Sequence, residues 1–470
     1  MPGFIWLRES DGGASFQKLH SRGVGTRGQP LPGCGRRPID STSCQLMYGL
    51  SELPGGLRVV TATMPHLASV SVGIWVNTGG RHETARENGA AHFIEHMLFK
   101  GTRRRSAARI SQDVEGIGGY LNAFTDEEHT CFYSRAVASR LPELLDVLCD
   151  MFLESKFAPT EISKERDVIL EEQAMYRDQP AELVHDLLNQ VQFAEHPLGR
   201  PVIGSASSVR GLRRKNLLGF FERRYVSGSI VIAAAGNLTH ANLLTEVNRW
   251  IRRFRQGSHP PAEPAPATPE KPRWLLHSKK TEQTHIALGF RTASRQDERR
   301  FALRLLNVLL GENMSSRLFQ TIREEHGLAY NIQSTGTCWS DCGDLVISAG
   351  LEDTQLEKAL KLILKEVQRL VDRAPGRAER SRARDYALGQ ADLSLEGSEQ
   401  MMMWLGEQVL GFGRVVPPKE TRARIAAVQP ADIRRVARDF LKPSHLSLAL
   451  VSPRTSDRGL GALLESWSGR

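Results

Sequence analysis

The sequence predicts an α+β protein of two homologous halves, each a mostly antiparallel sheet packed with helices. Short alternating runs rich in β-branched residues are interleaved with longer helical runs in both parts of the chain, and their order repeats. The proline-rich segment 257–272 lies between the two copies, and its prolines exclude helix and favour an extended spacer. We therefore expect domains at residues 47–256 and 273–470, joined by this segment.

Length and composition agree with two folded domains. A chain of 470 residues is too long for one ordinary core. Hydrophobic residues make up 40% and charged residues 24%, which are globular proportions. No apolar run approaches the roughly 18 residues of a membrane span, so we expect no membrane-spanning segment.

The formal net charge of +9 does not indicate nucleic-acid binding. Lys and Arg are scattered among acidic residues and form no stripe interleaved with aromatics. The six cysteines are too sparse for a disulfide framework, which favours a reducing compartment. Cys338 and Cys342 lie four apart, but no second Cys/His pair accompanies them, so we interpret them as ordinary thiols.

Residues 1–46 form a leader for which we expect disorder, because six Lys/Arg and three Asp/Glu stand among many Gly and Pro. The leader lacks the apolar region of a secretory signal, and its acids and helix breakers disfavour a mitochondrial transit peptide. Translation that starts at Met47 in place of Met1 is a third interpretation.

The first half begins with two alternating strands, at residues 57–63 and 70–76. The chain then turns helical after Asn88, which we predict to be the N-cap. A third strand, at residues 130–137, leads into a helix with one apolar face. That face consists of Leu141, Leu144, Leu145, Leu148 and Phe152.

The second half repeats this order. A strand at residues 285–290 precedes a helical run at 297–310, and a strand at 344–350 precedes another amphipathic helix. The order of elements indicates an internal duplication. Only the first half carries a polar motif on its early helix, because residues 306–310 at the matching place are almost all apolar. We expect chemistry in the first half and support in the second.

The segment His92-Phe93-Ile94-Glu95-His96 is the strongest sign of chemistry. Residues four apart share a helix face about 5–6 Å apart, so His92 and His96 can both direct a ring nitrogen at one ion. Glu95 borders this face, close enough to take a proton from a metal-bound water without being a ligand. The order is the inverted form of the commoner zinc-peptidase helix. The alternative is a pair of inert helix histidines with an acidic partner.

A third ligand is available in the helical segment 165–172. Glu165 and Glu172 are two turns apart and therefore share a face. Glu172 can supply a carboxylate oxygen and leave the fourth position open for water, as a catalytic zinc site requires. Glu165 would then contact the metal ligands without binding the metal itself. The alternative for this segment alone is a solvated acidic face.

These motifs resemble the pitrilysin and insulinase peptidases, in particular the branch that holds the mitochondrial processing peptidase β subunit and its bacterial relatives. Residues 92–102 match the signature helix, and residues 165–172 match the segment with the third ligand, at the family's spacing of 76 from His96 to Glu172. Residues 196–204 and 314–319 match as well. The resemblance covers the chain from about Met47 to about Pro453.

The resemblance implies a zinc endopeptidase that acts on extended or unfolded polypeptides. It implies one zinc ion per chain. The implied roles are His92, His96 and Glu172 as ligands, Glu95 as general base and Glu165 as a supporting acid.

The resemblance also implies residues that bind the substrate. Asn122 and Ala123 match an exposed strand edge to which an extended peptide adds as one more strand. Arg323 and Tyr330 match an Arg and a Tyr that reach the substrate near the metal, where each can donate to a carbonyl oxygen as negative charge develops.

In this family two halves of a long chain, or two chains, close around the substrate like a clamshell. This chain has both the zinc motif and the Arg323/Tyr330 pair, so we expect a homodimer whose sites are completed across the interface. A noncatalytic partner chain is the alternative. Asp126, Glu127 and Glu171 depart from the common pattern, and their charge predicts a preference for basic residues near the cleaved bond.

A noncatalytic scaffold of the same fold, like the core subunits of the respiratory bc1 complex, is the alternative function. The four residues His92, Glu95, His96 and Glu172 favour the enzyme, because a scaffold has no chemical need to keep them all. We expect a cytoplasmic location in a bacterium, with the mitochondrial matrix as the alternative.

Overall fold

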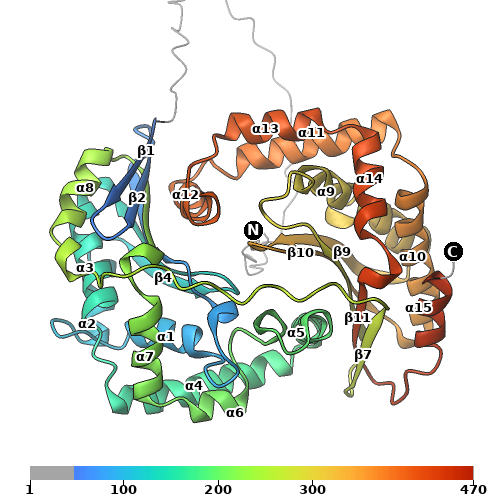
Figure 1. Cartoon of the computed structure of the whole chain (residues 1–470), viewed down its shortest axis with the longest axis horizontal. Helices are drawn as coiled ribbons and strands as arrows, with labels where there is room; N and C mark the ends of the chain where they lie inside the picture. The colour runs from blue at the N-terminus through green and yellow to red at the C-terminus, as the bar shows by residue number, and fades with distance from the viewer. Residues whose placement is uncertain (1–46, 469–470) are drawn as a thin grey trace, which may run out of the picture.

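The computed structural model describes residues 47–468, which form two sheets packed with helices (Figure 1). The leader predicted for residues 1–46 lies outside the described residues. No described helix is long and apolar enough to cross a membrane. The strands are β1 (Met47–Leu53), β2 (Leu57–Thr63), β3 (Ser69–Val76), β4 (Tyr120–Thr125), β5 (Thr130–Val137), β6 (Ile230–Gly236), β7 (Arg273–Ser278), β8 (Thr284–Thr292), β9 (Ala329–Cys338), β10 (Gly343–Leu351) and β11 (Leu446–Ser452).

The α-helices pack on these sheets. In the first half they are α1 (Ala90–Leu98), α2 (Ala107–Glu115), α3 (Leu141–Glu154), α4 (Pro159–Arg177), α5 (Pro180–Phe193), α6 (Ala206–Gly211), α7 (Arg214–Arg224) and α8 (His240–Asn248). In the second half they are α9 (Arg300–Asn307), α10 (Leu356–Asp372), α11 (Arg377–Leu393), α12 (Ser398–Phe412), α13 (Pro418–Ala427), α14 (Pro430–Phe440) and α15 (Leu460–Ser468).

The two sheets share one topology. The first has the order β1-β2-β6-β3-β5-β4 and the second has the order β7-β11-β8-β10-β9. In the first sheet β2 and β6 run parallel and the other neighbouring strands are antiparallel. In the second sheet β7 and β11 are the parallel pair and the other neighbours are antiparallel. Apart from β1, each strand therefore has a counterpart in the other half. The predicted duplication and the α+β class are confirmed.

One face of each sheet is covered by helices of its own half. In the first sheet alternate side chains such as Val59 and Ile74 pack against α1, α3, α7 and α8. In the second sheet Ile286 and Leu288 pack against α9, α10 and α14 in the same way. These two clusters are the main hydrophobic cores.

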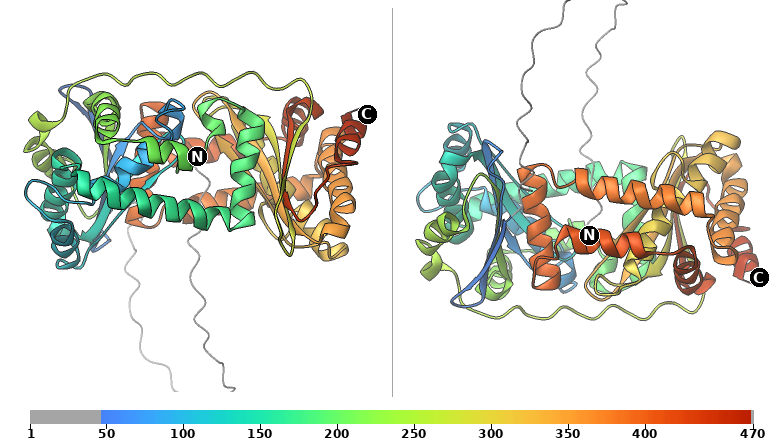
Figure 2. Two further views of the ribbon diagram at one scale, coloured as in Figure 1. Left: turned by 90° about the horizontal axis from the view of Figure 1, so that it is seen from below. Right: turned by 90° about the horizontal axis from the view of Figure 1, so that it is seen from above.

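The opposite face of each sheet is covered by a helix from the other half (Figures 1 and 2). On α12, Leu405 packs against the first sheet in one cluster with Val60 and Trp75. On α5, Leu188 packs against the second sheet beside Ala287. The two halves therefore exchange one helix each across the proline-rich segment. The sequence pattern did not predict this exchange, because strand periodicity does not reveal which helix covers which face of a sheet.

The proline-rich segment 257–272 is extended and runs along one side of the molecule from the first half to the second (Figure 2). The carbonyl of Glu263 accepts a hydrogen bond from Arg81 of the first half, at 3.1 Å. The backbone N–H of Ala265 donates to Asp341 of the second half, at 2.8 Å. This segment is therefore held against both halves.

An ion cluster beneath this segment joins the halves. Both oxygens of the buried Glu128 carboxylate are paired, one with Arg81 of the first half at 2.8 Å and one with Arg295 of the second half at 3.0 Å. Ser340 donates to the same carboxylate, and Arg81 also pairs with Asp341 at 2.6 Å. Charges this deeply buried are tolerated only when they are paired and hydrogen-bonded.

We predict that Leu405→Ala lowers the melting temperature of the protein. The side chain is fully buried between α12 and the first sheet, and its truncation costs about 2–5 kcal/mol because a cavity remains. Thermal unfolding followed by circular dichroism measures the change. Leu393→Ala is the matched control, because Leu393 is 60% exposed at the end of α11. Equal melting temperatures for the two variants would contradict the packing role of α12.

Candidate metal centre

Helix α1 carries the metal motif and is positioned by a buried carboxylate. Its N-cap is Gly89, in a left-handed conformation with φ of 90° and without a side-chain cap. The Glu83 carboxylate replaces that cap, since it accepts the backbone N–H groups of Gly89 and Ala91 at 2.7 Å each. The N-cap predicted at Asn88 is therefore wrong by one residue, and the Asn88 side chain donates to Glu83 and to the carbonyl of Pro201.

Glu83 is a residue that sequence reasoning missed. It is 2% exposed, and burial raises its pKa to about 8, although the helix N–H donors act in the opposite direction. Its only signal in the sequence is its place a few residues before the motif. The contact needs the chain to fold back so that a side chain replaces the missing cap.

Three donor atoms converge between α1 and α4. His92 and His96 lie one turn apart on α1, with ring centroids 4.7 Å apart. Their Nε2 atoms lie 3.9 Å and 3.7 Å from Oε2 of Glu172 on α4. These separations are too long for hydrogen bonds and near the edge of about 3.4 Å of a tetrahedron with zinc bonds of about 2.1 Å. The donor set therefore fits a zinc ion.

The surroundings of His92 favour the neutral imidazole that binds a metal. Burial, and then the neighbouring His96, lowers the pKa of His92 to about 3, so its imidazole is neutral at pH 7. Burial raises the pKa of Glu172, and His96 opposes this shift. All three side chains keep some exposure, between 13% and 31%, which leaves one side of the group open.

Glu165 lies directly behind His96. Its Oε2 is 3.1 Å from Nδ1 of His96, and its Oε1 pairs with Nζ of Lys100 at 2.8 Å. When the Nδ1–H of His96 donates to this carboxylate, Nε2 is left with its lone pair toward Glu172 and the metal position. Glu165 thus orients a ligand ring in the way that zinc sites commonly use.

Glu95 is on α1 beside His96 and contacts the end of β4. Its Oε2 accepts a hydrogen bond of 2.5 Å from the hydroxyl of Thr125, the last residue of that strand. Burial raises the pKa of Glu95, while the bond from Thr125 and the charge of His96 act in the opposite direction. Asn122 and Ala123 lie on the same strand, which is at the edge of the first sheet, and Asn122 is exposed.

Arg323 and Tyr330 lie in the second half and contact each other. The Arg323 guanidinium lies 5.0 Å from the centre of the Tyr330 ring and 4.7 Å from that of the Phe319 ring. Arg323 and Phe319 belong to the π-helix Phe319–Glu325. Tyr330 is 81% exposed. Within residues 47–468, no hydrogen bond, ion pair or ring contact joins this pair to the three donors. The fold therefore brings together the first-half site residues and leaves this pair apart.

The acids that predicted a basic preference have different surroundings. Asp126 accepts the backbone N–H groups of Glu128 and His129, so it stabilises the turn between β4 and β5. Burial raises the pKa of Glu127 to about 7. Glu171 is exposed on α4. Of these three carboxylates, only that of Glu171 is free to face a peptide.

Two further acids, Glu182 and Asp186, were missed. They are four residues apart on α5. Burial, and then the charges of Glu172, Glu182 and Asp186, raises the pKa of Tyr176. Burial, and then Glu182, raises the pKa of Asp186 to about 6. The i,i+4 spacing of two acids on one helix is the signal that could have found them.

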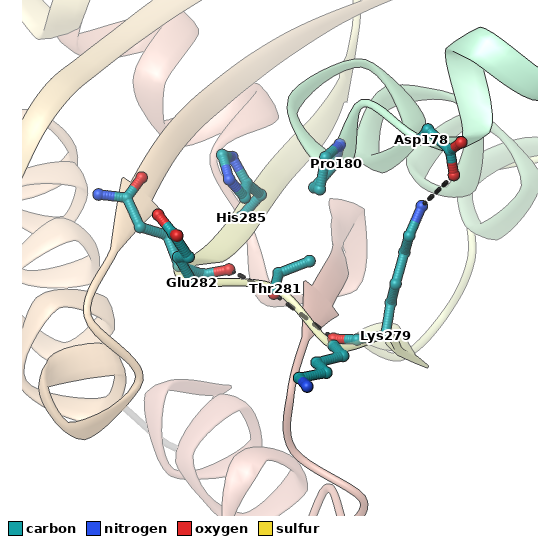
Figure 3. Close-up of a pocket in the computed structure, with 8 residues that line it drawn as sticks. Asp178, Pro180, Lys279, Thr281, Glu282 and His285 are labelled. Atoms are coloured by element: carbon teal, nitrogen blue, oxygen red, sulfur yellow. Dashed lines mark hydrogen bonds and ion pairs between the residues drawn. The ribbon is translucent and has the colours of Figure 1, made fainter.

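A hollow lies at the junction of the exchanged helix and the second sheet (Figure 3). Its lining includes Asp178 just before α5, Pro180 at the first position of α5, Lys279 just after β7 and His285 in β8. Lys279 pairs with Asp178 at 3.2 Å. Within residues 47–468, the only convergent group of three or more potential metal ligands is His92, His96 and Glu172.

Comparison with known proteins identifies one family over most of the chain. Residues 58–206 match the family model described as Insulinase (Peptidase family M16), and residues 211–386 match the model described as Peptidase M16 inactive domain. The chain is 40% identical to an uncharacterized zinc protease of Streptomyces coelicolor, over 86% of this chain and 89% of the relative. It is 35% identical to one of Bacillus subtilis, over 85% of this chain and 96% of the relative.

Solved structures share the fold. A protease from Helicobacter pylori has a TM-score of 0.83 at 19% identity and covers 87% of this chain and 100% of its own. A structure of a peptidase M16 inactive domain from Pseudomonas fluorescens has a TM-score of 0.81 at 17% identity, over 88% of this chain and 100% of its own. The family matches in both halves and the extensive identity to bacterial relatives show that this chain belongs to the insulinase family of peptidases, peptidase family M16.

Proposed function

We propose that this protein is a zinc metalloendopeptidase that hydrolyses extended or unfolded peptides, with one zinc ion per chain. The observation that carries the proposal is the convergence of His92, His96 and Glu172, with the carboxylate of Glu95 beside them and outside the donor set. The family and the names of the bacterial relatives support it. We also expect a cytoplasmic location.

The chain's own residues perform the proton transfers of this reaction. A bound zinc ion supplies Lewis-acid chemistry, since it polarises the carbonyl of the scissile bond and lowers the pKa of water. Glu95 takes a proton from the attacking water as its oxygen adds to the carbonyl carbon. The same carboxyl then gives that proton to the leaving nitrogen as the C–N bond breaks. Arg323 and Tyr330 donate to the carbonyl oxygen as it becomes negative.

The edge strand β4 binds the peptide in this proposal. An extended peptide that pairs with the free edge at Asn122 and Ala123 is read mainly through its backbone, which suits substrates of varied sequence. The alternative function is a noncatalytic scaffold of the same fold. We favour the enzyme because the ligands, the base and the hydrogen bond from His96 to the Glu165 carboxylate are all present, and a scaffold has no use for them.

We propose a homodimer in which Arg323 and Tyr330 of one chain serve the zinc site of the other. Two observations support it: Tyr330 is 81% exposed, and the side-chain contacts described above for this pair stay within the second half. A large exposed aromatic ring beside a guanidinium is a common feature of residues that complete a partner's site. A noncatalytic partner chain is the alternative.

We predict that Glu95→Gln abolishes peptide cleavage and keeps the zinc. The amide cannot take a proton from water, so kcat falls by at least about 100-fold, whereas zinc content measured by atomic emission stays near one ion per chain. Glu115→Gln, an exposed change on α2, is the control and retains activity. Full activity of Glu95→Gln would exclude this residue as the base.

We predict that a mixture of Glu95→Gln and Tyr330→Phe proteins recovers activity that neither has alone. In a mixed dimer one site has the intact Glu95 of one chain and the intact Tyr330 of the other. After subunit exchange about a quarter of wild-type activity is expected, because about half of the dimers are mixed and each has one intact site. No recovery, or a fully active monomer in light scattering, would contradict the shared site.

We predict that peptides with Arg or Lys near the cleaved bond have kcat/KM about 3- to 10-fold above matched norleucine peptides. Glu182 and Asp186, whose charges act on Tyr176 together with that of Glu172, supply the negative charge. The raised pKa of Asp186, about 6, means that the carboxylate is charged above that pH and the preference is lost as pH falls through it. Asp186→Asn removes the pH dependence. A peptide library cleaved without basic enrichment would refute the prediction.

A further inference from the structure

The hydrogen bond between Thr125 and Glu95 takes no part in the proton transfers proposed above. Glu95 is on α1 and Thr125 is the last residue of β4, so the bond joins the metal helix to the substrate strand. It is 2.5 Å long, as expected for a hydroxyl that donates to a carboxylate. It is the only hydrogen bond from residues 47–468 to the Glu95 carboxylate, and it engages Oε2 alone.

The direction of this hydrogen bond follows from the neighbouring hydroxyl. Thr125 faces Thr130 across the strand pair, and their hydroxyl oxygens are 3.4 Å apart. The hydroxyl of Thr130 donates to the backbone carbonyl of Thr78 at 2.8 Å, so its proton is already used. The proton of the Thr125 hydroxyl therefore goes to Glu95, which is nearer by 0.9 Å than the alternative acceptor.

Thr125 is held in place from both sides. The turn that follows it is paired with the neighbouring loop, because the N–H groups of Gly80 and Arg81 donate to the carbonyls of Asp126 and Glu127 at 3.0 Å and 2.7 Å. Glu128, in the same turn, pairs with Arg295 of the second half. The backbone that carries the Thr125 hydroxyl is therefore fixed relative to both halves.

We propose that Thr125 is a positioning residue for the general base. Its hydroxyl holds Oε2 of Glu95, so that Oε1 is directed to the attacking water. Because Asn122 and Ala123 lie on the same strand as Thr125, β4 positions both the peptide backbone and the base. A peptide that pairs with β4 thereby brings its scissile carbonyl to the oxygen that receives the proton, which is the orientation effect that makes proton transfer efficient. This inference rests on the proposed peptidase function.

The simplest alternative is that Thr125 only ends the strand and fills space. Thr125→Val keeps the shape and the β-branched backbone preference but removes the hydroxyl, whereas Thr125→Ser keeps the hydroxyl and removes the methyl group. The two variants therefore separate the hydrogen bond from the packing. Thr335→Val is the matched control, because Thr335 is an exposed threonine of β9, the counterpart of β4 in the second half.

The kinetic experiment compares these variants with the zinc-loaded wild type on one peptide. We expect Thr125→Val to lower kcat about 10- to 100-fold, with KM within twofold and zinc content and melting temperature unchanged. Thr125→Ser and Thr335→Val should stay within about threefold of wild type. In the Glu95→Gln background, Thr125→Val should add no further loss, because the base it positions is gone. A Thr125→Val enzyme with wild-type kcat, or an equally impaired Thr125→Ser enzyme, would overturn the proposal.

A structural readout separates this inference from the proposed function. Crystal structures of the zinc-free proteins should have Glu95 in one orientation in wild type and Thr125→Ser, and in a turned or multiple orientation in Thr125→Val. Thr125→Ala is the second variant if Thr125→Val does not fold. An unchanged Glu95 in the variant crystals would overturn the positioning role even in an active enzyme. An inactive zinc-loaded wild type with a reoriented Glu95 in Thr125→Val would instead reject the proposed function.

Discussion

The buried ion cluster around Glu128 is the constraint on which the arrangement of this molecule depends. A carboxylate that is 4% exposed needs partners for both oxygens, and here they come from both halves, Arg81 and Arg295. Burial alone would raise the pKa of Glu128, but Arg295 and His129 and the hydrogen bonds from Ser340 outweigh it and lower the pKa to about 2. The pairing is therefore intact across the physiological pH range, and separation of the halves would leave buried charges without partners.

The exchange of α5 and α12 adds a hydrophobic counterpart to this polar junction. Each sheet buries its second face only when the helix of the other half is present, as Leu405 and Leu188 illustrate. Neither half has a complete pair of covered faces by itself. The two homologous sheets are thus packed together through the exchanged helices, and only the first half carries the candidate metal ligands among the described residues.

The site depends on this packing through the turn between β4 and β5. That turn includes Glu128 and directly follows Thr125, which contacts Glu95, the proposed base. At the other end of the motif helix, Glu83 fixes the backbone of Gly89 and Ala91. Helix α1 is therefore held at its first turn by the Glu83 carboxylate, while its Glu95 side chain accepts a hydrogen bond from a hydroxyl of the sheet. Both contacts come from residues outside the motif.

The sequence by itself determined the duplicated order of elements, the separating segment and the set of donors. These are local properties: the i,i+4 spacing brings His92 and His96 to one helix face whatever the rest of the chain does, and two turns relate Glu165 to Glu172. Only the tertiary structure decided which helix covers which sheet, that Glu83 caps α1 and that Thr125 meets Glu95. It also showed that Asp126 stabilises a turn and that the charges of Glu182 and Asp186 act on Tyr176. These contacts join residues far apart in the chain or on different elements. These contacts form because buried charges must be paired in the folded state, and the periodicity of the sequence does not show which residues will be paired.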